Sequence, residues 1–585
     1  MILLAIASLL LFFVTYFTGI STVNFLKKFL SLNISINFFE IFLFGLITCY
    51  VYFNLLSFFI PVNYLTLIPL LLLSIYFFSK KTVRQKFLLQ LRQTGSVFFS
   101  VKNLLFTIPF LALLFLYWII PPLNVDSGEY HYIAIRWYEQ FKVIPGLANV
   151  HGRLAFNPGS FIISAAWSFT DLTGQSIYPL NGVLVFVFYV WLVKKVLMPA
   201  GLLYRLIILM MVIFLFRVTL INISSPSSDV LSGILLFYCG FRTYELMKEH
   251  KNSFSDYFVV LILIFVSVTT KLSAIPSLLL IPFIYFIVVE KNRQISVVIK
   301  SMLLAAIIIV PWLVRNYILS GYLLYPVPGT NLFYADWAVP HNVIQLDYLF
   351  SKYGPRTITV DFITMQKMNI VQLTKVWYNY VSVNSLSSLL ITLLSLLSPA
   401  LWILFTLLKK KISLTIFLLW CIYYCCTWIW FLNSPEHRFG LPYLILAAGI
   451  PLLALTQTVS LKWNMPAAVF TIIIWLFSLH YVLSVFKRVP IHSFAINDFW
   501  LKPLKDKRYL IATKNNNFLQ TFTSVNLGNG VKLYLPFGDH ECLNAPGPCM
   551  NWRYGEIEMR GNKMEDGFRN KTDEVKKYFP FVDIK

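Results

Sequence analysis

Apolar runs of about twenty residues recur along most of this chain, and they restrict what it can fold into. Its 585 residues are 58% hydrophobic and only 12% charged. A helical run of about 20 apolar residues spans the roughly 30 Å hydrocarbon core of a bilayer. Backbone polar groups inside lipid must be hydrogen-bonded within the segment, and a helix achieves this. The sequence therefore predicts a polytopic α-helical membrane protein.

We expect about fourteen membrane-spanning helices, at roughly 20 residues for each crossing. They lie near residues 1–20, 38–60, 62–79, 103–120, 178–198, 202–221, 229–247, 255–270, 275–289, 296–319, 386–408, 412–433, 440–457 and 465–486. The first run lacks a basic start and a small-residue cleavage site. We therefore expect it to be a retained helix rather than a removed signal peptide.

Lysine and arginine gather in alternate connectors between these runs and set the expected orientation. The strongest basic cluster lies between residues 80 and 92. Cytoplasmic loops of membrane proteins are enriched in Lys and Arg, so this side is predicted to be cytoplasmic. Topology also explains the formal charge of +23 better than nucleic-acid binding does. The extracytoplasmic segments are then the loops 121–177 and 320–385, the turns 222–228 and 434–439, and the tail 487–585.

The composition of the chain changes near residue 486. Residues 1–486 form the predicted transmembrane domain, whereas residues 487–585 carry charge throughout and have expected strands at Arg508–Lys514 and Val531–Pro536. This tail is predicted to be a small extracytoplasmic α+β domain. Cys542 and Cys549 flank a short loop rich in Pro and Gly. They predict a local disulfide if the tail faces an oxidising compartment.

A polar cluster follows the apolar run that ends near residue 120. Asp126, Glu129 and His131 occur within six residues there, in a chain with few charges. A carboxylate in this position can serve as a general base toward an acceptor hydroxyl, and Asp126 is the first candidate, with Glu129 the second acid. Metal binding is an alternative, because the three side chains offer oxygen and nitrogen ligands. Their spacing matches no known metal motif.

The residues after this cluster have the spacing of an amphipathic helix. Apolar side chains recur every three or four residues from Tyr130 to Phe141, and Glu139 lies on the other face. This pattern predicts a helix along the outer membrane interface. Asp126 and Glu129 also fit a capping box at the start of that helix, so helix capping is the simpler interpretation of both residues.

Further polar residues fall on the same predicted side of the membrane. They lie in outer loops or near the outer ends of expected helices, and we predict that they line a substrate site: His131, His151, Arg153, Asn157, Asp229, Lys271, Arg315 and Arg438. The cations suit an anionic headgroup such as a phosphate or pyrophosphate. Simpler interpretations are solvated loop residues, cations that extend to water, and a helix cap at Asp229.

This arrangement resembles the GT-C superfamily, polytopic glycosyltransferases that take sugar from a polyprenyl-phosphate or polyprenyl-pyrophosphate carrier. The shared features are an acidic residue at the start of the first large outer loop, an interfacial helix after it, and a soluble C-terminal domain. Five runs also look like those of a bacterial membrane-protein family of unknown function near that superfamily: Asp126–Arg153, Ser224–Asp229, Lys271–Ser273, Pro311–Asn316 and Pro435–Gly440.

The resemblance implies transfer of a sugar, with inversion, to a glycan, lipid or protein acceptor at the extracytoplasmic face of the bacterial inner membrane. Asp126 would be the general base or the carboxylate that orients the acceptor, and Asp229 would be the second outer-loop acid. Arg315 and Arg438 would contact the carrier phosphate, because a phosphate leaving group needs neutralisation more than protonation. The expected partners are the bilayer and the lipid-linked donor, and a divalent cation such as Mg²⁺ or Mn²⁺ is a candidate cofactor.

Two other functions fit the sequence. An O-antigen-type polysaccharide polymerase or ligase also has many helices and large outer loops, but it depends on loop arginines and histidine. A transporter or flippase of lipid-linked glycans is the second alternative. Transporters tend to have internal repeats and ionisable residues at the bilayer midplane. Here no repeat is evident, and the charges lie near the outer ends of the expected helices.

Overall fold

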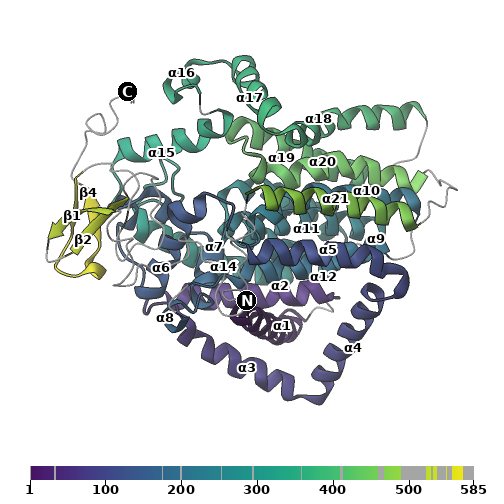
Figure 1. Ribbon diagram of the computed structural model, residues 1–585, viewed down its shortest axis with the longest axis horizontal. Coiled ribbons are helices and arrows are strands. Elements are labelled where there is room, and N and C mark those ends of the chain that lie inside the picture. Colours follow the sequence, from purple (N-terminus) through teal and green to yellow (C-terminus); the bar gives the residue numbers. More distant parts are fainter. Residues whose placement is uncertain are drawn as a thin grey trace.

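The computed structural model describes residues 2–31, 35–120, 122–173, 176–197, 201–251, 253–292, 295–357, 359–408, 413–458, 467–488, 522–528, 531–536, 549 and 556–570. Long helices lie side by side along one direction, and short helices and strands gather at one end of the bundle (Figure 1). We call this the loop end.

Among the described residues, eight helices are long and apolar enough to cross a membrane. They are α1 (Ile2–Leu30), α2 (Phe38–Leu56), α9 (Pro179–Leu197), α10 (Leu202–Asn222), α14 (Ile295–Ser320), α18 (Leu386–Leu407), α19 (Leu414–Asn433) and α20 (His437–Thr458). A ninth candidate combines η1 (Tyr64–Leu67) and α3 (Ile68–Ser79) with α4 (Lys81–Phe98), across a bend of 89°. The chain is therefore a multi-pass helical membrane protein with eight or nine candidate spans.

This number differs from the fourteen crossings expected, although each of the fourteen predicted segments is helical. Four of them contain shorter apolar stretches: Asn103–Ile119 in α5 (Val101–Ile119), all of α12 (Phe254–Thr270), Leu272–Val288 in η5 (Leu272–Leu279) with α13 (Leu280–Asn292), and Ile472–Val485 in α21 (Ala467–Arg488). A fifth, α11 (Ser228–Lys248), has the length of a span but carries four charged residues. Length and composition alone thus support fewer spans than the sequence pattern predicts.

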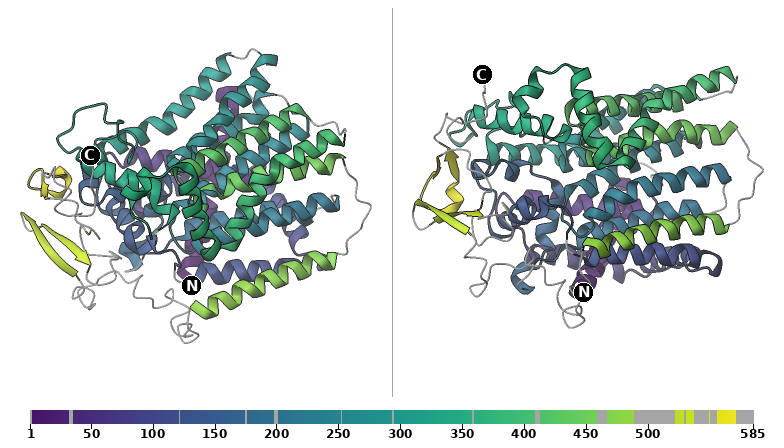
Figure 2. Two further views of the ribbon diagram at one scale, coloured as in Figure 1. Left: turned by 90° about the horizontal axis from the view of Figure 1, so that it is seen from above. Right: turned by 45° about the horizontal axis from the view of Figure 1, so that its top comes forward.

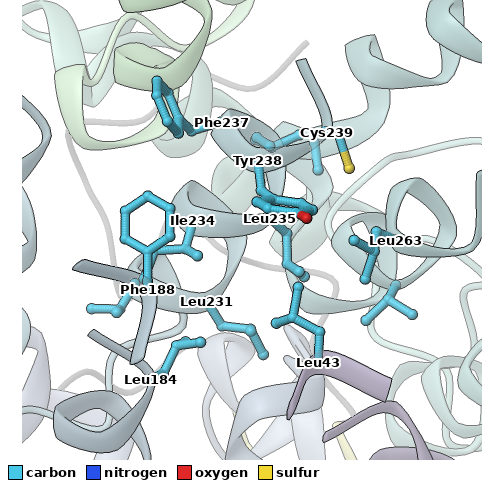
Figure 3. Close-up of a cluster of buried hydrophobic side chains, with 14 of the residues drawn as sticks. Leu43, Leu184, Phe188, Leu231, Ile234, Leu235, Phe237, Tyr238, Cys239 and Leu263 are labelled. Carbon is cyan, nitrogen blue, oxygen red and sulfur yellow. The ribbon is translucent and has the colours of Figure 1, made fainter. Parts of the chain in front are cut away.

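Helix α11 tolerates polar residues because it lies inside the bundle. Its buried side chains meet those of α2, α9 and α12 in a cluster that includes Leu43, Phe188, Leu235 and Leu263 (Figure 3). Close van der Waals packing of these side chains favours the packed state, and a helix that is buried on most sides needs no single apolar face. The position of α11 fixes the start of the helix, where Asp229 lies.

Helices α1 and α2 pack so closely that two positions must be glycine. A Cβ atom on Gly45 would overlap the carbonyl oxygen of Thr15, and one on Gly19 would overlap the carbonyl oxygen of Ile41. Small residues at such crossings let two membrane helices approach backbone to backbone.

Two segments build most of the loop end. The first contains η2 (Ser127–His131), α6 (Tyr132–Gln140), η3 (Leu147–Asn149), η4 (Gly152–Ala155), α7 (Gly159–Ala166) and α8 (Thr170–Thr173). The second contains α15 (His341–Tyr353), η6 (Gly354–Arg356), α16 (Phe362–Lys367) and α17 (Ile370–Asn384). They correspond to the predicted outer loops 121–177 and 320–385.

The helix expected at the membrane interface, α6, is instead mostly buried within the protein. Seven of its nine residues are buried, including Glu139, which the pattern assigned to the polar face. The carboxylate of Glu139 pairs with Arg136 and accepts a hydrogen bond from Thr170 Oγ1 at 3.1 Å. Helix α7 packs against α6 and covers a face that the sequence alone would leave to lipid.

The C-terminal region contains two short antiparallel sheets. β1 (Phe522–Gly528) pairs with β2 (Val531–Pro536), and β3 (Ile557–Met559) pairs with β4 (Phe568–Asn570), which follows η10 (Met564–Asp566). The expected strand at Val531–Pro536 is confirmed. The expected strand at Arg508–Lys514 lies outside the described residues.

This region lies at the loop end in every view (Figure 2). Phe568 N donates to the carbonyl oxygen of Pro145 at 3.0 Å, and Arg560 forms two contacts of 2.8 and 2.9 Å with Asp336. Cys549 is disulfide-bonded. Its expected partner, Cys542, lies outside the described residues.

Candidate functional site

The polar cluster predicted after residue 120 begins with a π-helical turn, η2, and not with a capped α-helix. Asp126 precedes this turn and its side chain makes no capping hydrogen bond. The Glu129 carboxylate pairs with Arg153 instead of reaching back to the helix start. The capping-box interpretation is therefore wrong for both acids. Single π-turns occur frequently at functional sites.

The acids and bases from five separate segments form one chain of ion pairs, which we call the outer cluster. Its members are Asp126, Glu129, Arg153, Asp229, Lys271, Glu436 and Arg438. Residues far apart in sequence meet here because η2, η4, α11, the end of α12 and the start of α20 all reach the same end of the bundle. The sequence predicted six of the seven members as site residues.

Arg438 is the hub of the outer cluster. Its Nη1 lies 2.6 Å from Asp126 Oδ2 and 3.4 Å from Asp229 Oδ2, while its Nε lies 3.9 Å from Glu436 Oε1. Arg153 Nη1 pairs with Glu129 and lies 3.8 Å from Asp126 Oδ1. One guanidinium thus lies within 4 Å of three carboxylates, two of which also pair with a second cation.

Asp229 is an ion-pair partner rather than a helix cap. The cap of α11 is Ser227, whose hydroxyl accepts a hydrogen bond from Asp229 N at 3.3 Å. The Asp229 side chain is 2% exposed and pairs with Lys271 as well as Arg438. The Lys271 ammonium also lies 3.6 Å from the ring centre of Phe439, a cation–π contact. A buried carboxylate requires such partners.

A layer of hydrogen-bonded polar residues lies next to the cluster. Ser127 Oγ lies 2.7 Å from Ser225 Oγ, and Asn124 Nδ2 donates to Asn222 Oδ1 at 2.7 Å. Asn181 Nδ2 donates to the carbonyl oxygen of Ser225 at 2.6 Å. These bonds fix the turn before α11 against the start of η2. Sequence reasoning missed Asn181, because a single Asn in an apolar run carries no spacing signal.

The environment holds Asp126 ionised. Burial raises the pKa of Asp126, but Arg438, His131 and Arg153 together outweigh burial and bring the pKa well below its usual range. His131 is buried beside it, and burial lowers its pKa to about 4 despite the attraction of Asp126 and Asp229. His131 is thus neutral at neutral pH, with Nδ1 3.5 Å from Ser225 Oγ.

Four predicted site residues are not members of the outer cluster: His131, which lies beside Asp126, and His151, Asn157 and Arg315. His151 is buried and its Nδ1 accepts a hydrogen bond from Arg153 N at 3.1 Å, so it caps η4. Asn157 donates to Asn316 Oδ1 at 2.7 Å. Arg315 contacts the Ser57 hydroxyl and lies 4.3 Å from the Tyr138 ring centre.

Most side chains of the outer cluster remain accessible. Apart from Asp229, each keeps between 18% and 35% of its surface exposed. An anionic group could therefore reach the cations, and a hydroxyl could reach the carboxylates. This combination of buried anchoring and partial exposure suits a binding site for a polar or charged ligand.

The donor set gives little support to a metal. In the part of the chain that the structure describes, no group of three or more His, Cys, Asp or Glu residues is arranged to hold a metal ion. The carboxylates of the cluster face arginine and lysine instead. A divalent cation would have to displace these side chains, so no step is assigned to one.

The fold and the outer cluster together define a multi-pass helical membrane protein with a charged site at one end of its bundle. The family described as "Domain of unknown function (DUF8201)" has a model that matches residues 1–445, and the chain belongs to that family. All seven members of the cluster lie within the matched residues. Neither the curated proteins nor the solved structures yield a match to the chain.

Proposed function

We propose that the chain is a GT-C-like glycosyltransferase that moves a sugar from a polyprenyl-phosphate or polyprenyl-pyrophosphate carrier to a glycan, lipid or protein acceptor. The reaction takes place at the extracytoplasmic face of the bacterial inner membrane, where the loop end and the C-terminal region lie. The observation that carries this proposal is the outer cluster, in which carboxylates and cations alternate and stay partly exposed at one end of a membrane bundle.

The two kinds of charge match the two needs of the reaction. Departure of the carrier phosphate requires positive charge, which Arg438 and Lys271 supply. The acceptor hydroxyl requires a carboxylate that orients it. Asp126 suits that second role, because its lowered pKa keeps it ionised but makes it a weak base.

The two alternative functions, a polysaccharide polymerase or ligase and a transporter, can be distinguished from the transferase by the effects of variants. Arg153 pairs with Glu129, so a loop arginine belongs to the same site and suits a polymerase or ligase. Such an enzyme would lose activity on Arg153→Met while tolerating Asp126→Asn. A flippase would lack product transfer altogether but would change the sidedness of the lipid-linked glycan.

The test is complementation of a deletion strain of the source organism. Wild-type chain and Asp126→Asn would be compared by mass spectrometry of lipid-linked and envelope glycans. We expect the variant to insert normally and to lose the transferred sugar by about 100-fold or more. Asp171→Asn is the matched control, because Asp171 is 53% exposed and lies outside the cluster. Unchanged glycans in the Asp126→Asn strain would refute the proposal.

A further inference from the structure

Glu436 joins the outer cluster although the sequence did not single it out as a site residue. It lies in the turn between α19 and α20, two residues before Arg438. Its side chain is 35% exposed, more than that of any other carboxylate in the cluster. Among the residues that the structure describes, it forms one ion pair, the long one to Arg438 Nε at 3.9 Å. Glu436 therefore has the most exposed carboxylate side chain of the site, although about two thirds of it is still covered.

Two indole groups fix the backbone that carries this open side chain. Trp430 Nε1 donates to the carbonyl oxygen of Glu436 at 2.8 Å, and Trp377 Nε1 donates to that of Pro435 at 3.3 Å. The Trp377 ring also stacks on His437, with 5.6 Å between ring centres. A side chain on a fixed backbone loses little further freedom when a substrate binds.

A buried arginine fixes the end of the preceding helix. Arg356 is 1% exposed, and its Nη2 donates to the carbonyl oxygens of Phe431 and Leu432 at 2.9 and 3.0 Å. These carbonyls belong to the last turn of α19, where no intrahelical donor is available. The second outer loop thus supplies Arg356 and Trp377, both of which hold the turn that carries Glu436.

The surroundings of Glu436 and Asp126 shift the pKa values of the two carboxyls in opposite directions. Burial raises the pKa of Glu436, and Asp229 raises it further, while Arg438 and Lys271 act in the opposite direction. The net effect is a raised pKa, whereas Asp126 on the same arginine has a lowered one. Two carboxylates whose environments separate their pKa values are suited to different roles in proton transfer.

We propose that Glu436 is the proton acceptor of the transfer reaction and that Asp126 only orients the acceptor. Glu436 would take the proton from the acceptor hydroxyl as the oxygen forms a bond to the anomeric carbon of the sugar. The bond from that carbon to the carrier phosphate breaks, and its electron pair leaves with the phosphate beside Arg438 and Lys271. Glu436 then releases the proton to water. This role depends on the transferase function proposed above.

The test compares three variants in membranes of the complemented deletion strain, with their endogenous donor. Glu436→Gln keeps an oxygen for Arg438 but cannot accept the proton, so we expect a loss of product of about 100-fold or more. Glu436→Asp should restore part of the activity. The wild-type rate should fall on acidification at a pH above the ordinary glutamate range, because the base is lost once protonated. The midpoint of this fall should shift in Glu436→Asp.

The outcomes separate the two proposals. Glu565→Gln, an exposed site on η10, should match wild type. If Glu436→Gln retains the wild-type rate while Asp126→Asn has lost it, Glu436 is not the base and the transferase function stands. If neither variant loses product, the transferase function itself is overturned. An unshifted acid midpoint in Glu436→Asp would also count against Glu436 as the base.

Discussion

Helix α11 carries a carboxylate–arginine centre near each end, and the two centres differ in how much they leave open. At its start, Asp229 belongs to the outer cluster. About 20 Å along the helix, Arg242 meets Glu40 of α2, with 3.3 Å between Nε and Oε1. Glu40 is fully buried and accepts hydrogen bonds from Tyr238 Oη and Asn37 N, both at 2.7 Å.

The comparison shows how a candidate binding site differs from a structural contact when the residue types are the same. Both oxygens of Glu40 have donors within the protein and no access to solvent, so nothing is left for a ligand. In the outer cluster, three carboxylates share one arginine and most side chains are partly exposed. Shared partners and exposure, rather than the presence of charge, make the outer cluster the candidate site.

Among the variants that test this comparison, we expect Arg438→Met to have the largest effect on the amount of transferred product. The variant removes the cation that Asp126, Asp229 and Glu436 share, and we expect the transferred product to fall by about 100-fold or more. Asp229 keeps Lys271, so the protein should remain folded. Glycan mass spectrometry and thermal unfolding of the purified chain measure the two properties. If this variant formed the normal amount of product, the outer cluster would be a structural contact, like the pair of Glu40 and Arg242.

Arg242→Met should have the opposite profile. It leaves Glu40 buried without its cation, and the loss of stability should be about 3–5 kcal/mol. The double variant Glu40→Met with Arg242→Met should recover most of that loss, since replacing both partners of a buried pair is often nearly neutral. The free energy of unfolding of the wild type, the single variants and the double variant, measured in one detergent, would test this expectation. Product per folded molecule should stay at the wild-type level in both.

A smaller effect is expected from Glu129→Gln. Arg153 loses its carboxylate partner but keeps Asp126 at 3.8 Å, so product should fall by about 10-fold, close to 1.4 kcal/mol. The acceptor concentration dependence of the rate would show whether binding or turnover changes. A loss as large as that of Asp126→Asn would mean that Glu129, and not Asp126, is the essential acid of η2.

The smallest effect concerns stability at acidic pH. Burial lowers the pKa of His131 to about 4 and that of His151 to about 3, with Arg153 adding to the shift of His151. The unfolded chain takes up these protons from about pH 6.5 downward, whereas the folded chain does not. Stability should therefore decrease between about pH 6.5 and 4. The decrease should be smaller in His151→Gln than in the wild type. If stability fell equally with pH in the two proteins, the pKa of His151 would not be lowered by folding.

The sequence predicted the fold class well because apolar length is a strong local signal. The helix predicted at 229–247 is also present, as α11, and its charged residues are tolerated because neighbouring helices surround it. The same cause explains α6: Glu139 fitted a polar face, but α7 and Thr170 cover it in the fold. Burial by distant segments cannot be read from periodicity alone.

For the site, the residues were easier to predict than their partners. Scarcity of charge identified Asp126, Arg153 and Arg438, but nothing in their spacing predicted that one guanidinium would join two acids from different helices. Glu436 had a usable signal, since it lies two residues before Arg438 in a short polar turn between two apolar runs. Arg315 is also a charged residue near the end of an apolar run. It is not part of the outer cluster, because its side chain lies over the ring of Tyr138.

The contact made by Phe568 has a consequence for how members of this family can vary. Phe568 is fully buried and meets the ring of Trp137 at 6.1 Å between centres, yet it lies beyond the residues that the family model matches. A relative without this C-terminal segment would leave an indole and the Pro145 carbonyl uncovered. Such a relative must carry a different cover or a more polar residue at the position of Trp137, so the two regions should change together over evolution.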